Sequence, residues 1–297
     1  MVGTISWGQI WMEPLHTTGK TSFAIVADLT TWQKCQAEIL RYRDVLEAEQ
    51  LPSYIVADRW KHPEQLREIL LKLYNEQHLE GAVFIGDIPI PMIRKAQHMT
   101  SAFKMDEKKY PMIRSSVPSD RFYDDFDLKF DFLKQDSLNP LMFYYNLSAV
   151  SPQDIRCDIY TGRIKPVISE GLDKYQQIRD YLSKAVAAHQ EANRLDQFVS
   201  YTGEGSYSNS LTAWRAEQQT LREQLPGVFD RKNNARFMRY SMWDYPKDDV
   251  ITVLKREDLD MMIFHEHGLP HRQYLSAVPS THDYEQHMEI LKREVRL

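Results

Sequence analysis

Short apolar runs without polar alternation recur in the first third of the chain, and they constrain the fold more than any other feature. The runs cover residues 22–28, 53–58 and 81–87. Between them, apolar side chains recur with helical spacing over 31–49 and 62–78. A strand without polar alternation is covered on both faces, as in a parallel sheet with crossover helices on its two sides. The sequence therefore predicts an α/β fold, with a mainly parallel sheet flanked by helices in three layers.

An aspartate ends each of these runs: Asp28, Asp58 and Asp87. Ligands of open α/β sheets bind at the carboxyl ends of the strands, so the three aspartates are candidates for lining a crevice. An aspartate at this position also caps a following helix or turn, because its carboxylate accepts hydrogen bonds from backbone amides. Capping is the interpretation that requires no ligand.

The alternation breaks between residues 88 and 150, where prolines punctuate a stretch rich in methionine, aromatic residues and aspartate. We expect an irregular insertion at 88–150 within a single domain that spans 1–297. Alternation resumes after the insertion. The expected elements are a strand at 155–164, a helix near 167–194, a strand at 198–201, a helix near 209–224, a strand at 235–240, a helix near 247–256 and a strand that ends at 268.

Composition excludes several classes of protein. The net charge of −5 argues against a general nucleic-acid binder, whose phosphate contacts require a basic face. No stretch approaches the roughly 20 apolar residues of a membrane span, and no signal peptide is visible at the N-terminus. The two cysteines do not make a disulfide framework, so we expect Cys35 and Cys157 to be small buried residues.

An apolar strand near the end of the chain leads into His-Glu-His-Gly at 265–268. Residues two apart on an extended segment lie on one face, so both histidine rings would point the same way. With His271 nearby, His265 and His267 could ligate zinc. The other interpretations are a single catalytic histidine, His267, and a structural or surface role. Metal hydrolases of this kind need further ligands from later strands, so we assign no metal ligand.

Carboxylates cluster among aromatic side chains shortly after residue 119. Oxygen-rich loops of this kind suit structural calcium, with Asp120, Asp124, Asp125 and Asp127 as the candidate ligands. Their spacing departs from an EF-hand loop, which has glycine at its sixth position. The alternative is a solvated acidic loop anchored by buried aromatic residues, and no cofactor is required in that case.

Four short segments occur in an order that is similar to one known family. They are Gly-Asp-Ile-Pro after a strand at 86–89, Ser-Asp before two aromatic residues at 119–123, a strand ending in Gly-Arg-Ile at 158–164, and an apolar strand ending in His-Gly at 267–268. In this order they resemble the gingipain family of caspase-like cysteine peptidases. The resemblance covers roughly residues 20–275, and it departs from the family's Gly-Arg-Ile-Pro at Lys165, which precedes the proline.

The resemblance implies a caspase-like fold with a Cys/His dyad at the strand ends. His267 matches the family's catalytic histidine, and the Gly268 amide would help to bind the oxyanion of the tetrahedral intermediate. His265 is the second candidate, followed by its neighbour Glu266. In the family the nucleophilic cysteine ends the next core strand, but this sequence has no cysteine after Cys157, which lies one strand too early.

We therefore expect the larger part of a cysteine-type endopeptidase domain, truncated before its last core strands and inactive by itself. One alternative is a non-catalytic peptide-binding or scaffold module on the same fold. Another is a metal-dependent hydrolase that uses His265, His267 and His271. The expected partner is a peptide or protein substrate, without nucleic acid or a membrane span. Since the family is typically exported by bacteria, the resemblance implies a periplasmic, surface or secreted protein.

Overall fold

The computed structural model describes most of the chain, and its contacts divide into two compact units. The described residues are 8–16, 19–95, 107–152, 154–166, 171–191, 196–203, 211–226, 234–239, 246–269 and 272–275. Unit 1 is Met1–Glu191 and unit 2 is Ala192–Leu297. Each unit has a parallel sheet and buried apolar residues of its own, and the single domain expected over 1–297 stays a prediction.

Unit 1 contains a five-stranded sheet in the order β1-β3-β2-β4-β9. Neighbouring strands run parallel except at one edge, where β1 pairs antiparallel with β3. The prediction of a mainly parallel sheet flanked by helices is confirmed. The edge strand β1 was not predicted, because three residues are too few to show a period. The strands are β1 (Ile10–Met12), β2 (Ser22–Asp28), β3 (Ser53–Asp58), β4 (Leu79–Ile85) and β9 (Tyr160–Ile164).

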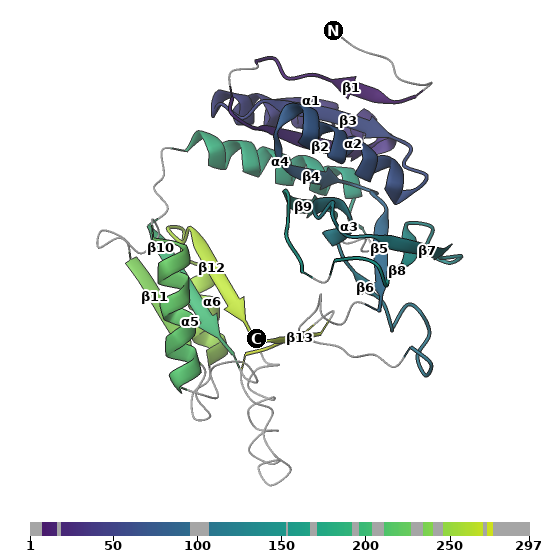
Figure 1. Ribbon diagram of the computed structural model, residues 1–297. Helices are drawn as coiled ribbons and strands as arrows, with labels where there is room; N and C mark the ends of the chain where they lie inside the picture. The colour runs from purple at the N-terminus through teal and green to yellow at the C-terminus, as the bar shows by residue number, and fades with distance from the viewer. Residues whose placement is uncertain are drawn as a thin grey trace. The chain divides into compact units, whose positions relative to one another are not determined.

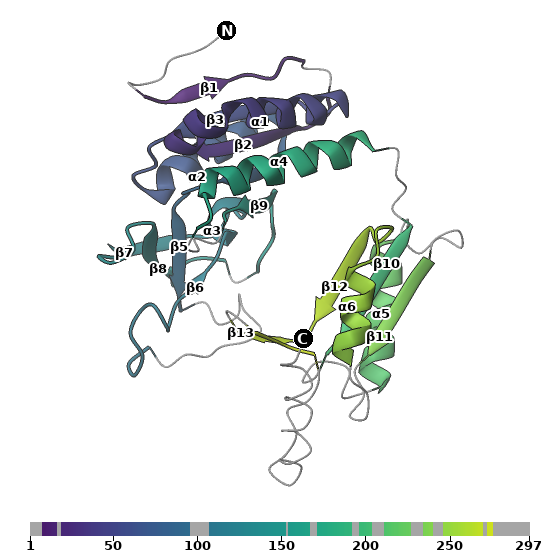
Figure 2. The same ribbon diagram turned by 180° about the vertical axis from the view of Figure 1, so that it is seen from behind.

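Helices cover both faces of this sheet, as Figures 1 and 2 show. They are α1 (Leu29–Ala48), α2 (Pro63–Gln77) and α4 (Lys174–Gln190). Successive side chains of β2 enter different cores: Val26 packs in the core that contains Leu70 of α2, while Ile25 packs with Ile39 of α1 and Ile178 of α4. All five side chains are fully buried, and each such burial stabilises the fold by about 1.5–3 kcal/mol. The apolar runs therefore lack polar alternation because the sheet lies between two cores.

The aspartates at the strand ends have structural partners. Asp28 is the N-cap of α1, because its Oδ1 accepts a hydrogen bond from the Thr31 amide at 2.9 Å. Its Oδ2 accepts the Asp87 amide at 2.8 Å, which connects the ends of β2 and β4. A Cβ at Gly86 would lie 2.2 Å from that oxygen, and the φ of +86° also requires glycine there. Asp58 accepts the amide of the following residue at 2.6 Å. The capping interpretation is confirmed for Asp28.

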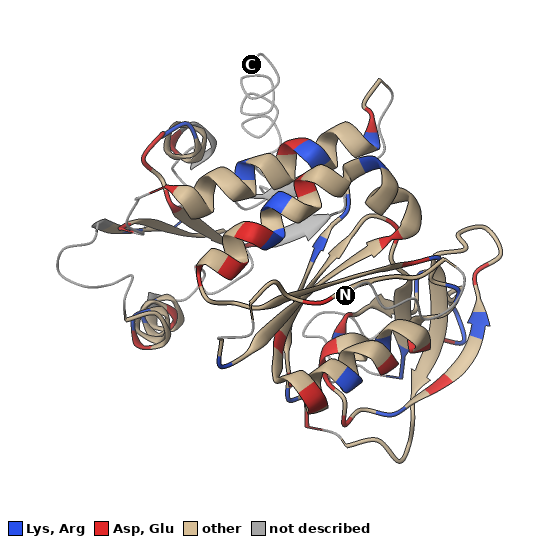
Figure 3. Ribbon diagram, turned by 90° about the horizontal axis from the view of Figure 1, so that it is seen from above, with Lys and Arg blue, Asp and Glu red and all other residues tan. Residues whose placement is uncertain are grey.

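The helices carry interspersed acidic and basic residues on their exposed sides (Figure 3). On α1, Arg41 donates to Glu38 at 2.9 Å, and on α2 Lys72 lies 4.0 Å from Glu76. Exposed pairs of this kind stabilise a helix by only about 0.3–0.5 kcal/mol each. Within the described parts of the chain, no helix is both long enough and apolar enough to cross a membrane.

The segment predicted to be irregular, 88–150, contains a four-stranded sheet in the order β6-β5-β8-β7. The aromatic residues of this segment form part of a hydrophobic core. Phe122, Phe143 and Tyr145 are buried together with residues of α2 and β4. Pro118 lies in the two-residue edge strand β6, where a missing amide costs little. The elements are β5 (Ile90–Arg94), β6 (Val117–Pro118), α3 (Arg121–Asp124), β7 (Phe130–Gln135) and β8 (Met142–Leu147).

Arg163 of β9 joins the five-stranded sheet to the chain that enters β5. Its Nε and Nη2 each donate to the Asp120 carboxylate at 2.8 Å. Its Nη1 and Nη2 donate to the carbonyls of Ile88 at 3.1 Å and Pro89 at 2.8 Å. The Tyr123 hydroxyl also donates to the Pro89 carbonyl, at 3.0 Å. Three of the four segments that resemble the gingipain family therefore meet at one guanidinium.

Unit 2 contains a three-stranded parallel sheet in the order β11-β10-β12. Figures 1 and 2 show α5 over one side of this sheet and α6 over the other. The last predicted strand ends earlier than expected: β12 stops at His265, and His267 begins a separate antiparallel hairpin. The elements are β10 (Gln197–Thr202), α5 (Leu211–Gln224), β11 (Asn234–Arg239), α6 (Pro246–Leu254), β12 (Met261–His265), β13 (His267–Leu269) and β14 (Arg272–Tyr274).

Replacing the guanidinium tests the role of this contact in the stability of unit 1. We expect Arg163→Lys to lower the free energy of unfolding by about 2 kcal/mol, because lysine cannot make the bidentate contact with Asp120 while it also bonds two carbonyls. Urea unfolding measures the loss.

The matched control is Arg156→Lys, since the Arg156 side chain is 83% exposed and lies 3.9 Å from Asp154. This control should change the unfolding free energy by less than about 0.5 kcal/mol. Equal effects of Arg163→Lys and Arg156→Lys would contradict a structural role for Arg163.

Candidate functional site

Two parallel strands of unit 2 end side by side and bring polar residues to one edge of the sheet. Thr202, the last residue of β10, lies opposite His265, the last residue of β12. The Gly203 amide then donates to the His265 carbonyl at 2.9 Å, which extends the pairing by one bond. Ligands of open α/β sheets bind at such carboxyl edges. We define this edge, with Thr202, His265 and Glu266, as the unit 2 edge.

His265 is held by a carboxylate of the helix that covers its face of the sheet. Its Nδ1 contacts Oε1 of Glu217, from α5. The other oxygen of Glu217 accepts the Thr202 hydroxyl at 3.4 Å. The Glu217 side chain is 16% exposed and the His265 side chain 39% exposed, so the carboxylate is largely covered while the imidazole remains open to solvent. A carboxylate at Nδ1 fixes the orientation of the ring, and the same arrangement occurs in acid–base histidines.

Glu266 adds a second carboxyl group directly after the strand. Both of its oxygens are buried, and neither has a hydrogen-bond partner among the described residues. Burial raises the pKa of Glu266, because a charged carboxylate loses its hydration there. The unit 2 edge therefore has one carboxylate bound to histidine and one carboxyl group shifted towards its neutral form.

The predicted catalytic residues His267 and Gly268 lie at the start of the hairpin. His267 pairs with Tyr274 and Gly268 with Gln273. The Tyr201 hydroxyl of β10 donates to the carbonyl that follows β14, at Leu275. The side chain of His267 lies outside the described residues, so its role as base, and the oxyanion role of Gly268, stay predictions.

The two cysteines belong to unit 1, whereas His265 belongs to unit 2. Cys35 is buried in α1, as predicted, and desolvation raises the pKa of its thiol. Cys157 is exposed, contrary to the prediction of a buried strand residue, because β9 begins only at Tyr160. The Arg121 guanidinium contacts its Sγ. Neither thiol lies in the unit that contains the oriented histidine.

The four candidate calcium ligands of unit 1 lie close together along the chain, and three of them have protein partners. Asp120 binds Arg163, as described above. Asp124 accepts the Thr161 hydroxyl at 2.8 Å and lies 3.2 Å from the Arg121 guanidinium. Asp125 accepts the Arg156 amide at 2.9 Å. Asp127 is exposed in a turn.

Over the described residues, no group of three or more histidine, cysteine or acidic side chains is arranged to hold a metal ion. Calcium binding by the four aspartates stays a prediction. The zinc set of His265, His267 and His271 also stays a prediction, because the His267 side chain and all of His271 lie outside the described residues.

A further charged group occupies the carboxyl edge of the unit 1 sheet. Asp87 binds Lys165 at 3.1 Å and Lys174 at 2.5 Å. Burial raises the pKa of Asp87, but the two lysines outweigh burial and leave that pKa below its ordinary value. The carboxylate is therefore charged and paired at neutral pH. This pairing fastens the start of α4 to the end of β4.

Comparison of the chain with known protein families, curated proteins and solved structures found no match. The functional argument therefore rests on the geometry of the unit 2 edge. Sequence reasoning missed Glu217 and Thr202. Nothing in the helical pattern at 209–224 distinguishes Glu217 from Glu223, and Thr202 becomes visible only through its register with His265.

Asp124 allows a test of burial through the pH dependence of stability. Desolvation raises the pKa of Asp124 to about 6 from 3.8, so folding favours its neutral form. Its stabilising contribution is complete below pH 3.8 and is lost as the pH rises through about 6. Because asparagine does not titrate, the free energy of unfolding of Asp124→Asn should not fall over this pH range. Relative to wild type, it should rise by about 1–3 kcal/mol between pH 4 and pH 7.

Urea unfolding at several pH values measures the difference between the two proteins. Asp154→Asn is the control, since that side chain is 84% exposed. A wild-type stability that runs parallel to that of Asp124→Asn across this pH range would show that Asp124 titrates normally.

Proposed function

We propose that this chain supplies the histidine part of a gingipain-like cysteine endopeptidase. The observation that supports the proposal is the pairing of His265 with Glu217 at the carboxyl edge of a parallel sheet. In peptide-bond hydrolysis by acyl transfer, a histidine passes a proton between the nucleophile and the leaving amine. Glu217 would stabilise the imidazolium that forms. Export from the cell, which the resemblance implies, belongs to the same proposal.

The proposal has two histidines for one role. The sequence resemblance matches His267, whereas the observed carboxylate partner belongs to His265. The two residues are separated only by Glu266, where β12 gives way to the hairpin. The Gly268 amide is the proposed oxyanion donor in both cases. The nucleophilic thiol is the component that neither Cys35 nor Cys157 supplies within unit 2.

A second candidate function needs no thiol at the unit 2 edge. If no thiol joins the unit 2 edge, the same edge can bind a peptide without cleaving it. The chain would then be a non-catalytic peptide-binding or scaffold module. Peptide hydrolysis separates the two functions, because the module binds peptides and leaves them intact.

The test uses the product of the complete reading frame that encodes these residues. We expect it to hydrolyse members of a peptide library and to be inactivated by iodoacetamide, which alkylates a catalytic thiolate. Replacement of the acid–base histidine should lower kcat/KM at least about a hundredfold. His265→Ala and His267→Ala therefore identify which of the two acts. Glu217→Gln, made in the wild-type protein, should lower kcat/KM if His265 is the base. It should leave kcat/KM nearly unchanged if His267 is the base.

The control is His189→Ala, because His189 also pairs with a glutamate, Glu49, but lies on α4 of unit 1. It should retain wild-type kcat/KM. A product that binds peptides without cleaving them supports the scaffold module. Hydrolysis that survives both His265→Ala and His267→Ala would exclude the proposed peptidase mechanism.

A further inference from the structure

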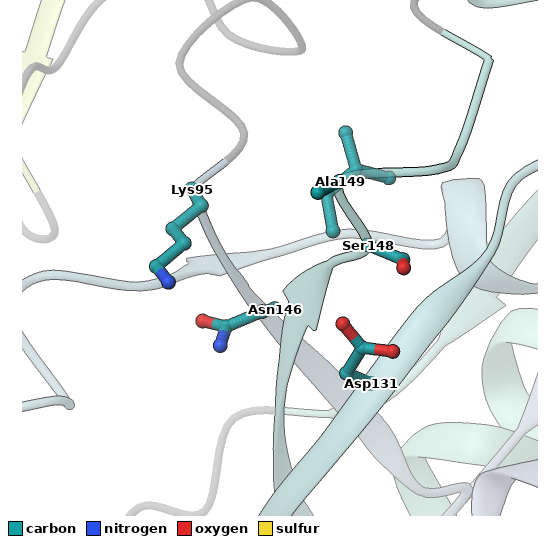
Figure 4. A pocket seen from close by; sticks show the side chains of 6 residues that line it. Lys95, Asp131, Asn146, Ser148 and Ala149 are labelled. Atoms are coloured by element: carbon teal, nitrogen blue, oxygen red, sulfur yellow. The ribbon is translucent and has the colours of Figure 1, made fainter.

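A hollow of about 330 Å³ lies at one end of the four-stranded sheet in unit 1. Its lining comes from three adjacent strands and the residues that follow two of them. Lys95 directly follows β5, Asp131 lies in β7, Asn146 and Leu147 lie in β8, and Ser148 and Ala149 follow β8. Figure 4 shows Lys95 and Asp131 on opposite sides of the hollow, with Asn146 between them. Its volume is at the lower end of the range for small-molecule sites.

Strand register places polar residues in a row across the sheet at this hollow. Asn146 of β8 lies opposite Asp131 on one side and opposite Arg94 on the other. Directly opposed residues point to the same face of a sheet. The neighbouring residue Tyr145 belongs to the hydrophobic core on the other face, as does its partner Ile93. The row therefore faces away from the core.

The groups in this row differ in whether protein partners satisfy them. Arg94 lies 3.3 Å from the Glu107 carboxylate, so its charge is compensated. The Oδ1 atom of Asn146 is buried and has no hydrogen-bond partner among the described residues. An unpaired buried acceptor costs about 1–3 kcal/mol, so it favours a ligand that brings a donor. Within the described chain, no ion pair involves the side chains of Lys95 or Asp131.

We infer that this hollow binds a free α-amino acid. The ammonium group of the ligand would donate to Asp131 and to Oδ1 of Asn146, and its carboxylate would accept from Lys95. The exposed methyl group of Ala149 would contact its side chain. The opposite charges across the hollow argue against an inorganic anion, which Asp131 would repel. A single carboxylate beside one amide is also too small a set for a bound cation.

The test measures the thermal unfolding midpoint of the whole chain with each common free L-amino acid in turn. We expect at least one of them to raise the midpoint, and titration calorimetry then gives its Kd. N-acetylation and amidation of that amino acid each remove one charge, and each should weaken binding at least about tenfold. Asp131→Asn and Lys95→Gln should weaken the binding of the unmodified amino acid by a similar factor.

Asp154→Asn and Lys72→Gln are the matched controls, because both side chains are exposed and neither lines the hollow. They should leave the Kd unchanged. The inference is overturned if no amino acid raises the midpoint, if binding survives N-acetylation or amidation, or if it survives both Asp131→Asn and Lys95→Gln. Peptide hydrolysis is a separate readout, so its absence does not bear on this site.

Discussion

The bidentate contact between Arg163 and Asp120 is the interaction on which the arrangement of unit 1 depends. One guanidinium bonds a carboxylate and the carbonyls of Ile88 and Pro89, so it holds the last strand of the first sheet against the chain that begins the second. It also lies 5.3 Å from the centre of the Phe84 ring. Three segments that resemble the gingipain family converge on this contact. In unit 1 these segments therefore lie where the two sheets are joined.

The apolar pattern of the sequence predicted those strands whose ends are set by nearby residues. The strands at 22–28 and 53–58 end where the sequence indicated, because both of their faces are buried and an aspartate or a turn follows at once. The second sheet was missed because prolines interrupt β5 and β6, and because pairing between segments distant in the sequence defines this sheet. The end of β12 at His265 was missed for a related reason. The strand ends there because the residues from His267 onward pair with β14 instead of continuing β12. The apolar pattern of the sequence does not indicate that pairing.

Polar groups at the strand ends fall into two kinds, and the distinction guides where function is sought. Asp28 and Asp87 are satisfied by backbone amides or lysines, so they stabilise the fold. Glu266 and Asn146 have buried oxygens without a partner in the described parts of the chain. A folded protein keeps such groups at a cost, since each lost its hydration without a replacement bond. The sequence could not separate the two kinds, because a partner for each oxygen depends on contacts between segments that are distant in the sequence.

The bond from the Tyr201 hydroxyl to the Leu275 carbonyl has a consequence for how this region can vary among relatives. The acceptor is a backbone atom, so any residue type at position 275 can provide it. The number of residues between His265 and that carbonyl, in contrast, sets where the acceptor falls relative to the Tyr201 hydroxyl. Substitutions in the hairpin should therefore be tolerated far more readily than insertions or deletions. The spacing between His-Gly and the residue whose carbonyl accepts this bond would be a more reliable signature than the hairpin residues themselves.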